Sequence, residues 1–274
     1  MTPGYVTHFG LSSAPFTKEI PDEELWLPAS KAAVVEELVE AVSERQSLVL
    51  VGEPGVGKTC VLRALRHRLP QAGFRLTYCH NATLGRRDFY RQLCLALGLT
   101  QSATAASVFF GVSQHVEELG RERVHPVFLL DEAHLLHQDT LDHLHILLNY
   151  QWDSKALLSL ILVGLPELDD RLAARRNRSL YSRLSRRLSL AQLSPDDTAE
   201  YIGLRLRRAG CDRELFASDA IAMLQEAATG ALRDVDRLAT ACLREAARKK
   251  KKLIERELVV RVLDAEAARP GEEP

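Results

Sequence analysis

The sequence predicts an α/β protein with a three-layer αβα domain around a five-stranded parallel sheet, followed by a small helical domain. Over the first 193 residues, short apolar runs alternate with amphipathic stretches, a pattern typical of parallel strands covered by helices on both faces. Beyond that point the strand patterns stop and helical periodicity dominates. The 274 residues, 46% of them hydrophobic, are enough for one large and one small core.

Turn or polar residues bound each of the five apolar runs that we expect to be strands. These runs occupy residues 46–52, 74–79, 125–131, 157–164 and 187–193. Ser194 then opens a helix with a serine cap, and Asp196 and Asp197 lie in its first turn. The expected organisation is an N-terminal arm, the αβα domain, the helical domain and a frayed tail, over residues 1–30, 31–193, 194–268 and 269–274.

The composition excludes two classes of protein. The 36 Lys and Arg against 37 Asp and Glu give a net charge of −1, so the chain does not coat nucleic acid by bulk charge. The longest apolar run, residues 156–166, is shorter than the roughly 18 residues that span a membrane, and the first residues lack a secretory leader pattern. We expect a cytoplasmic protein without a membrane anchor, whose five scattered cysteines are reduced.

A complete phosphate-binding motif, G-x-x-x-x-G-K-T, follows the first expected strand and precedes an amphipathic helix. Glycines let such a loop curl so that backbone N–H groups and the helix N-terminus face phosphate. Lys58 is expected at the β- and γ-phosphates of ATP, and Thr59 at Mg²⁺. The expected nucleotide-binding residues of the motif are Gly52, Pro54, Gly55, Val56, Gly57, Lys58, Thr59 and Cys60.

Two carboxylates follow the apolar residues 127–130. Because ligands of open α/β sheets sit at the carboxyl ends of the strands, Asp131 and Glu132 are expected beside the phosphates. Asp131 suits the outer shell of Mg²⁺, and Glu132 suits orientation and deprotonation of the attacking water. The alternative is that both residues cap the following helix. Together with the loop, the pair predicts hydrolysis of ATP to ADP and phosphate.

Seven arginines and no acidic residue lie between Arg171 and Pro195. They form either a solvated basic face or part of an active site, because an ATPase that assembles side by side presents an arginine to the γ-phosphate of its neighbour. Arg183 is the first candidate for this role in trans, with Arg186 and Arg187 as competitors. In the helical domain, Arg233 begins a helix after a glycine and is either a nucleotide contact or an ordinary surface residue.

Taken together, these residues resemble the AAA+ superfamily of P-loop ATPases over nearly the whole chain. Within it, residues 8–16, 131–135 and 163–168 are similar to a group with two branches. One comprises transposon-encoded ATPases of the TnsC, IstB and MuB type, which help a transposase choose its target. The other comprises secretion-pathway ATPases of the ExeA type. Residues 230–238, with leucine at 232 where secretion members tend to have proline, favour the transposition branch.

The transposition branch implies an ATP-dependent, DNA-binding regulator of transposition. Its subunits are expected to assemble as a ring or helical filament on double-stranded DNA, to recruit transposase and target-selection proteins, and to disassemble on ATP hydrolysis. DNA contact is expected at phosphates and is largely non-specific. Arg86 and Arg87 are the candidates, and the basic run 248–252 is an alternative phosphate patch. A secretion-pathway ATPase, or an ATP-dependent scaffold whose hydrolysis is dispensable, are the alternatives.

Leu165 departs from the resemblance, because members often carry a glutamine at this position after the fourth strand. Leucine cannot hydrogen-bond a γ-phosphate or a water. Slow hydrolysis, or sensing of the γ-phosphate by Asn149 instead, is therefore expected.

Two groups of ring-bearing side chains have open interpretations. Phe9, Phe16 and Trp26 form either a lip over the adenine or the packing of the arm onto the domain. A cluster of histidines follows Glu132 and lacks the spacing of a metal site, so structural or surface roles are favoured. These histidines are His134, His137, His143 and His145.

Overall fold

The computed structural model describes residues 3–79, 83, 85–99, 104–151 and 154–268, and it divides into two compact units. The sheet unit comprises Ala29–Glu53 and Lys58–Leu190. The helical unit comprises the chain up to Pro28, the loop Pro54–Gly57 and the chain from Ala191 onward. The two units meet between Leu190 and Ala191 on the C-terminal side, and the chain up to Pro28 groups with the helical unit.

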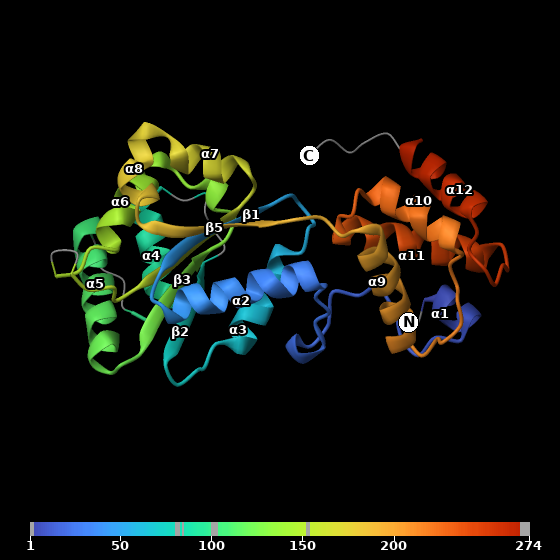
Figure 1. Ribbon diagram of the computed structural model, residues 1–274, viewed down its shortest axis with the longest axis horizontal. Coiled ribbons are helices and arrows are strands. Elements are labelled where there is room, and N and C mark those ends of the chain that lie inside the picture. Colours follow the sequence, from blue (N-terminus) through green and yellow to red (C-terminus); the bar gives the residue numbers. More distant parts are fainter. Residues whose placement is uncertain (1–2, 80–82, 84, 100–103, 152–153, 269–274) are drawn as a thin grey trace. The chain divides into compact units, whose positions relative to one another are not determined.

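The sheet unit is built on five parallel strands in the order β2-β3-β4-β1-β5 (Figure 1). β3 and β4 are buried along their whole length and β1 along nearly all of it, as the apolar runs of a doubly covered parallel sheet require. The predicted fold class is confirmed. The strands are β1 Ser47–Gly52, β2 Phe74–Cys79, β3 His125–Leu130, β4 Ser159–Gly164 and β5 Leu184–Leu190.

The fifth strand begins three residues earlier than the predicted 187–193. β5 pairs only with β1 and is an edge strand, so it alternates between buried leucines and exposed or half-exposed polar residues. Arg186 and Arg187 therefore lie within the strand, where charged side chains are common at sheet edges. A search for apolar runs misses such a strand's beginning because its first half reads as polar.

Helices cover both faces of the sheet. α2 and α3 pack on each other, and α2 also contacts β1 and β5. Helices α4 to α8 share one core cluster with Val49, Phe128 and Leu160, and alternation along the strands puts these three side chains on the same face. The helices are α2 Ala29–Ser43, α3 Lys58–Arg68, α4 Arg86–Ala96, α5 Ala105–Arg121, α6 Gln138–Leu147, α7 Glu167–Ala173 and α8 Arg178–Tyr181.

The helical unit contains five α-helices among its described residues, with a core of its own. The predicted helix start at Ser194 is confirmed. The Ser194 hydroxyl accepts a hydrogen bond from the Asp197 N–H, and the Asp197 carboxylate accepts one from the Ser194 N–H, both at 3.1 Å, which is a capping box. The helices are α1 Gly4–Phe9, α9 Pro195–Arg208, α10 Ser218–Ala228, α11 Leu232–Arg248 and α12 Arg256–Ala267.

The N-terminal segment is fastened to α9 by a buried arginine. Arg205 is 3% exposed, and its guanidinium donates to the backbone oxygens of Pro15 and Thr17. Trp26 donates from its indole nitrogen to Glu200 at 3.0 Å, and Phe9 is only 2% exposed, within the core. These aromatic residues pack the segment onto the helical unit, which is the second of the two interpretations proposed for them.

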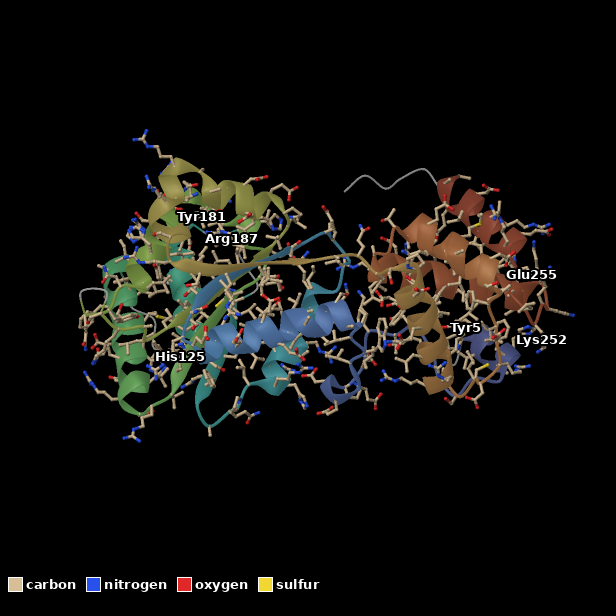
Figure 2. The ribbon with its side chains drawn as sticks, in the orientation of Figure 1. Tyr5, His125, Tyr181, Arg187, Lys252 and Glu255 are labelled. Carbon is tan, nitrogen blue, oxygen red and sulfur yellow. The ribbon has the colours of Figure 1, made fainter. Side chains whose placement is uncertain are left out.

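His125 is buried at the amino ends of β3 and β4 (Figure 2). Its Nε2 lies 2.9 Å from the hydroxyl of Ser159, and its ring meets Phe74 edge to face. Burial, with a smaller contribution from the charge of Arg45, lowers the pKa of His125 to about 4. The folded protein therefore holds this ring neutral at pH values where the unfolded chain, with a histidine pKa of about 6.5, protonates it.

We expect the stability of the protein to fall as the pH drops from about 6.5 toward about 4, because only the unfolded state takes up this proton in that range. His125→Gln retains a hydrogen-bond donor for Ser159 and removes the titration. The free energy of unfolding, measured by denaturant titration at several pH values, should therefore decline less steeply in the variant. The exposed His67→Gln is the control and should keep the wild-type slope. Parallel slopes for wild type and His125→Gln would contradict the assignment.

Candidate ATP-hydrolysis site

The loop between β1 and α3 has the curled backbone that its motif predicts. Gly55 and Gly57 have φ of +77° and +102°, the region that residues with a Cβ rarely adopt. α3 begins at Lys58, so the loop leads directly into the positive end of a helix. Within the motif Val56 is buried, whereas Thr59 is exposed and Cys60 is half-buried. Thr59 is therefore available to a bound metal.

Lys58 lies inside this curl. Its Nζ donates to the backbone oxygens of Gly52 at 2.6 Å and Glu53 at 3.1 Å. Both acceptors belong to the start of the same loop, so the ammonium group is held within the turn that surrounds the phosphates in P-loop proteins. The contact of Lys58 with the β- and γ-phosphates stays a prediction.

Arg233 meets the loop within the helical unit. Its backbone N–H donates to the carbonyl oxygen of Gly55 at 3.3 Å. A Cβ added at Gly55 would lie 3.1 Å from the Cβ of Arg233, which is a tight contact. The structure thus brings the predicted nucleotide contact Arg233 against the phosphate-binding loop, with its side chain exposed.

The buried strand β3 delivers Asp131 to the carboxyl edge of the sheet. Asp131 is 8% exposed. One carboxylate oxygen accepts from the Tyr78 hydroxyl at 2.7 Å, and the other accepts from the N–H of Glu132 at 2.9 Å. Burial and the bond to Asp131 raise the pKa of Tyr78, so this hydroxyl stays protonated and donates. The carboxylate is therefore held in place by two donors.

Tyr78 is a site residue that the sequence did not reveal. It belongs to β2 and lies opposite Leu129 of β3 in the register of the sheet. The run 74–79 alternates between exposed and buried residues, which identifies a strand and gives no sign of a site. Only the pairing of β2 with β3 brings the hydroxyl to Asp131.

Glu132 follows with a left-handed backbone, at φ +53°, which is unusual for a residue with a side chain. Its side chain is 48% exposed, and one oxygen lies 3.7 Å from Nε2 of His134. The structure thus shows neither carboxylate as a side-chain cap of the helix that follows. Glu132 turns toward solvent at the strand end, as a group that activates a water requires.

The register of the sheet relates the loop to the carboxylate pair. Val51 lies opposite Gly164, and Leu130 lies opposite Leu162. β4 separates β1 from β3, and strands lie roughly 4.8 Å apart, so the carboxylates begin about 10 Å from the end of β1. The donor set fits a magnesium nucleotide, because the lysine, the exposed threonine hydroxyl and the oxygen ligands all lie at this edge.

Three arginines near β5 differ in what holds them. Arg186 pairs with Glu40 of α2 and with Glu44, which follows α2. Arg187 lies 3.8 Å from the ring centre of Tyr181 and 3.7 Å from an oxygen of Asp169 (Figure 2).

Arg183 precedes β5 and donates to the backbone oxygen of Ser179 at 3.0 Å. All three arginines thus make contacts within their own chain, and the role of Arg183 in trans stays a prediction.

Asn149 follows α6 and is exposed, ten residues before β4 begins. Its role as a sensor of the γ-phosphate stays a prediction.

The DNA candidates Arg86 and Arg87 begin α4. The Arg86 guanidinium bonds to the ring of His143, and its backbone N–H donates to Asp139, whereas Arg87 is exposed.

The alternative phosphate patch at 248–252 is partly neutralised within the helical unit. Arg248 and Lys249 pair with Glu245, and Lys251 pairs with Glu255. Lys252 donates to the backbone oxygen of His8 at 2.7 Å. Much of the positive charge of residues 248–252 is therefore paired within the helical unit.

Within the described parts of the chain, no group of three or more His, Cys, Asp or Glu side chains is arranged to hold a metal ion, so the histidines after Glu132 do not form such a site. The five cysteines are free thiols, and four are buried. No described helix has both the length and the apolar character needed to cross a bilayer.

Comparison with known proteins agrees with this geometry. Residues 40–172 match the family model described as an AAA domain. The general secretion pathway protein A of Aeromonas hydrophila is 31% identical over 229 residues, which make up 82% of this chain and 42% of that protein. This chain thus matches less than half of the length of its curated relative.

Solved structures share the fold across nearly the whole chain. Cdc6p from Pyrobaculum aerophilum, at 17% identity, aligns over 92% of this chain and 70% of its own with a TM-score of 0.67. Aeropyrum pernix ORC1 in complex with DNA, at 20%, aligns over 93% and 69% with a TM-score of 0.66. Drosophila ORC bound to DNA, at 18%, aligns over 97% and 67% with a TM-score of 0.72.

The curled loop, the Asp131–Glu132 pair and the sheet order define an AAA-type P-loop ATPase. The chain is related to the general secretion pathway protein A of Aeromonas hydrophila. The fold implies the use of a nucleotide and, typically, of Mg²⁺.

We expect Gly55→Ala to weaken nucleotide binding by about tenfold or more, because a left-handed backbone costs a residue with a Cβ about 1 to 2 kcal/mol. The new methyl group would also press on Arg233. Titration with a fluorescent ATP analogue measures the loss. Gly73→Ala is the matched control, since its Cβ meets nothing within 4 Å. Equal affinities of the two variants would show that the loop does not need the glycine.

Proposed function

We propose that this site hydrolyses ATP with the residues that the motifs predict. Lys58 binds the β- and γ-phosphates, and Thr59 and Asp131 hold Mg²⁺ directly and through water. Mg²⁺ supplies neutralisation of the developing phosphate charge. Glu132 accepts the proton of the attacking water while the water oxygen bonds to the γ-phosphorus, and the bond to the bridging oxygen of ADP breaks. The observation that carries this proposal is the delivery of Asp131 and Glu132 by a buried strand to the edge of the sheet that holds Lys58.

The second part of the proposal is assembly of several copies of the chain. An arginine from one subunit stabilises the transition-state charge on the γ-phosphate held by the next. Arg183 is proposed for this role, because it directly precedes the edge strand β5, where an ATPase that assembles side by side presents an arginine to its neighbour. ATP at such a boundary makes assembly depend on the nucleotide, and hydrolysis removes the bridge.

The third part concerns the partner. We propose that the assembly, as a ring or filament, binds double-stranded DNA, recruits transposase and target-selection proteins, and disassembles on hydrolysis. The support comes from the segment 230–238, the exposed Arg87 at the start of α4 and the solved proteins of this fold that are bound to DNA. Binding through phosphates would be largely independent of sequence and sensitive to salt.

A specific observation favours a second candidate function, that of a secretion-pathway ATPase. The curated relative with 31% identity is a secretion-pathway protein. This candidate uses the same ATP site, and it differs in its partner: it requires protein partners of a secretion system and no retention of DNA. DNA binding therefore distinguishes the two candidate functions, whereas ATP turnover does not.

We expect Glu132→Gln to lower ATP turnover by about 100-fold or more while nucleotide binding stays intact, because the amide keeps the shape and loses the base. Under the DNA proposal, electron microscopy should show ordered assemblies on double-stranded DNA with a slowly hydrolysed ATP analogue. The Glu132→Gln variant should form them with ATP itself. Lys58→Ala, which removes the phosphate contact, is the matched negative control.

Three outcomes distinguish the candidates. ATP turnover without any ordered assembly on DNA, in all of these conditions, would contradict the DNA proposal and favour the secretion candidate. Transposition and target selection that are unchanged in Glu132→Gln would instead favour a scaffold whose hydrolysis is dispensable. Undiminished turnover in Glu132→Gln would contradict the proposed base.

We expect Arg183→Ala to lower turnover about 1,000-fold while ATP binding is retained, since an arginine supplied in trans contributes on that scale. A mixture of Arg183→Ala with Lys58→Ala should recover part of the activity. In the mixture, an intact loop from one variant meets an intact arginine from the other. Steady-state turnover across mixing ratios measures the recovery.

Arg187→Ala is the control for this experiment, because Arg187 is held by Tyr181 and Asp169 of its own chain. It should keep most of the turnover. Loss of activity in Arg187→Ala with full activity in Arg183→Ala would reassign the role. Absence of recovery in every mixture would contradict action in trans.

A further inference from the structure

His134 occupies a fixed position at the carboxyl edge of the sheet. It lies in the short 3-10 turn Ala133–Leu135 that follows Glu132, and its side chain is 15% exposed. The backbone oxygen of His134 accepts a hydrogen bond from Arg171 of α7 at 2.7 Å, and the same guanidinium bonds to the oxygen of Leu136. Arg171 therefore holds the turn at His134 and at Leu136, and the imidazole ring has a defined place.

One nitrogen of the imidazole faces the end of β4. The backbone N–H of Leu165 points at Nδ1 over 3.4 Å. Nδ1 accepts this bond, so the ring nitrogen that carries a proton is Nε2. A Cβ added at Gly164 would lie 3.2 Å from both Nδ1 and the backbone nitrogen of His134. The glycine at the end of the strand thus leaves the space that the ring occupies.

The other nitrogen faces Glu132. Nε2 lies 3.7 Å from Oε2 of the glutamate, slightly beyond a hydrogen bond. A contraction of less than an ångström, of the kind that accompanies formation of a catalytic complex, would complete it. With the proton on Nε2, the ring offers a donor to the carboxylate. The imidazole therefore connects the end of β4 to the group proposed as the base.

We propose that His134 is the positioning residue for Glu132. Donation from Nε2 to one carboxylate oxygen fixes the rotation of the glutamate and leaves the other oxygen for the water. The N–H of Leu165 sets the tautomer that makes this donation available. The backbone N–H of residue 165 can donate to Nδ1 whatever side chain the residue carries, so Leu165 is compatible with an ordered site. The inference rests on the proposed role of Glu132 in hydrolysis.

Three substitutions of His134 distinguish the roles of its two ring nitrogens. Glutamine places an amide donor near the position of Nε2, asparagine places an acceptor near Nδ1, and alanine provides neither. We expect His134→Ala and His134→Asn to lower kcat about 10- to 100-fold, on the scale of a misplaced catalytic group. KM for ATP and the affinity for an ATP analogue should stay close to wild type, and His134→Gln should recover much of kcat.

The glutamate variant supplies the second measurement. If His134 acts through the carboxylate, His134→Ala should cause no further loss of single-turnover hydrolysis in a Glu132→Gln background. Losses that multiply in the double variant would overturn the proposal, and so would equal losses in the Ala and Gln variants. A thermal unfolding midpoint for each variant accompanies the kinetics, so that a drop in kcat with an unchanged midpoint is assigned to the site.

The two proposals fail in different ways. If wild type hydrolyses ATP and Glu132→Gln does not, while His134→Ala matches wild type, only the positioning role is refuted. If Glu132→Gln matches wild type, the base itself is misassigned. The single-residue variants therefore refute one proposal without refuting the other.

Discussion

Burial of the three inner strands is the constraint on which the rest of the structure depends. β1, β3 and β4 carry apolar side chains toward helices on both faces, and an unpaired polar group in their middle would be costly. Polar chemistry is therefore confined to strand ends. The parallel direction gathers the carboxyl ends of the strands at one edge. Since β4 lies between the other two, its own end becomes the middle of the candidate site, which gives Gly164 and Leu165 their importance.

The arginine-rich stretch between Arg171 and Pro195 also depends on contacts with the rest of the sheet unit. No acidic residue lies between Arg171 and Pro195, so its arginines find carboxylate partners only outside this stretch. Arg176 pairs with Asp142 of α6, and Arg186 pairs with Glu40 of α2 and with Glu44, which follows α2. Arg171 bonds to backbone oxygens of the turn after β3. A segment whose charge suggests an anion-binding surface thus serves largely to fasten the sheet unit together. Net charge along a sequence indicates partners only after internal pairs are subtracted.

Local patterns allowed much of this site to be predicted from the sequence. The loop with Lys58 follows from its motif, and Asp131 and Glu132 follow from an apolar run that ends in two carboxylates. What escaped prediction depends on pairing between distant elements. The hydroxyl of Tyr78 reaches Asp131 only because β2 lies beside β3, and the ring of His134 meets the end of β4 only because β4 lies on the other side. The start of β5 was also missed, because the first half of this strand is polar. The N-terminal segment was predicted as a separate arm, whereas Arg205 holds it on α9.

The ATP site by itself does not distinguish the two candidate functions. The match to the secretion protein reaches 82% of this chain and only 42% of that protein, so more than half of that protein has no counterpart in the match. Both functions require the same cycle of binding and hydrolysis at the ATP site. The difference must therefore arise on surfaces that the cycle exposes or hides, such as the start of α4 with Arg87. Because contacts to DNA phosphates weaken steeply with salt whereas a packed protein interface depends on salt far less, the salt dependence of partner binding is a sharper guide to function than the rate of hydrolysis.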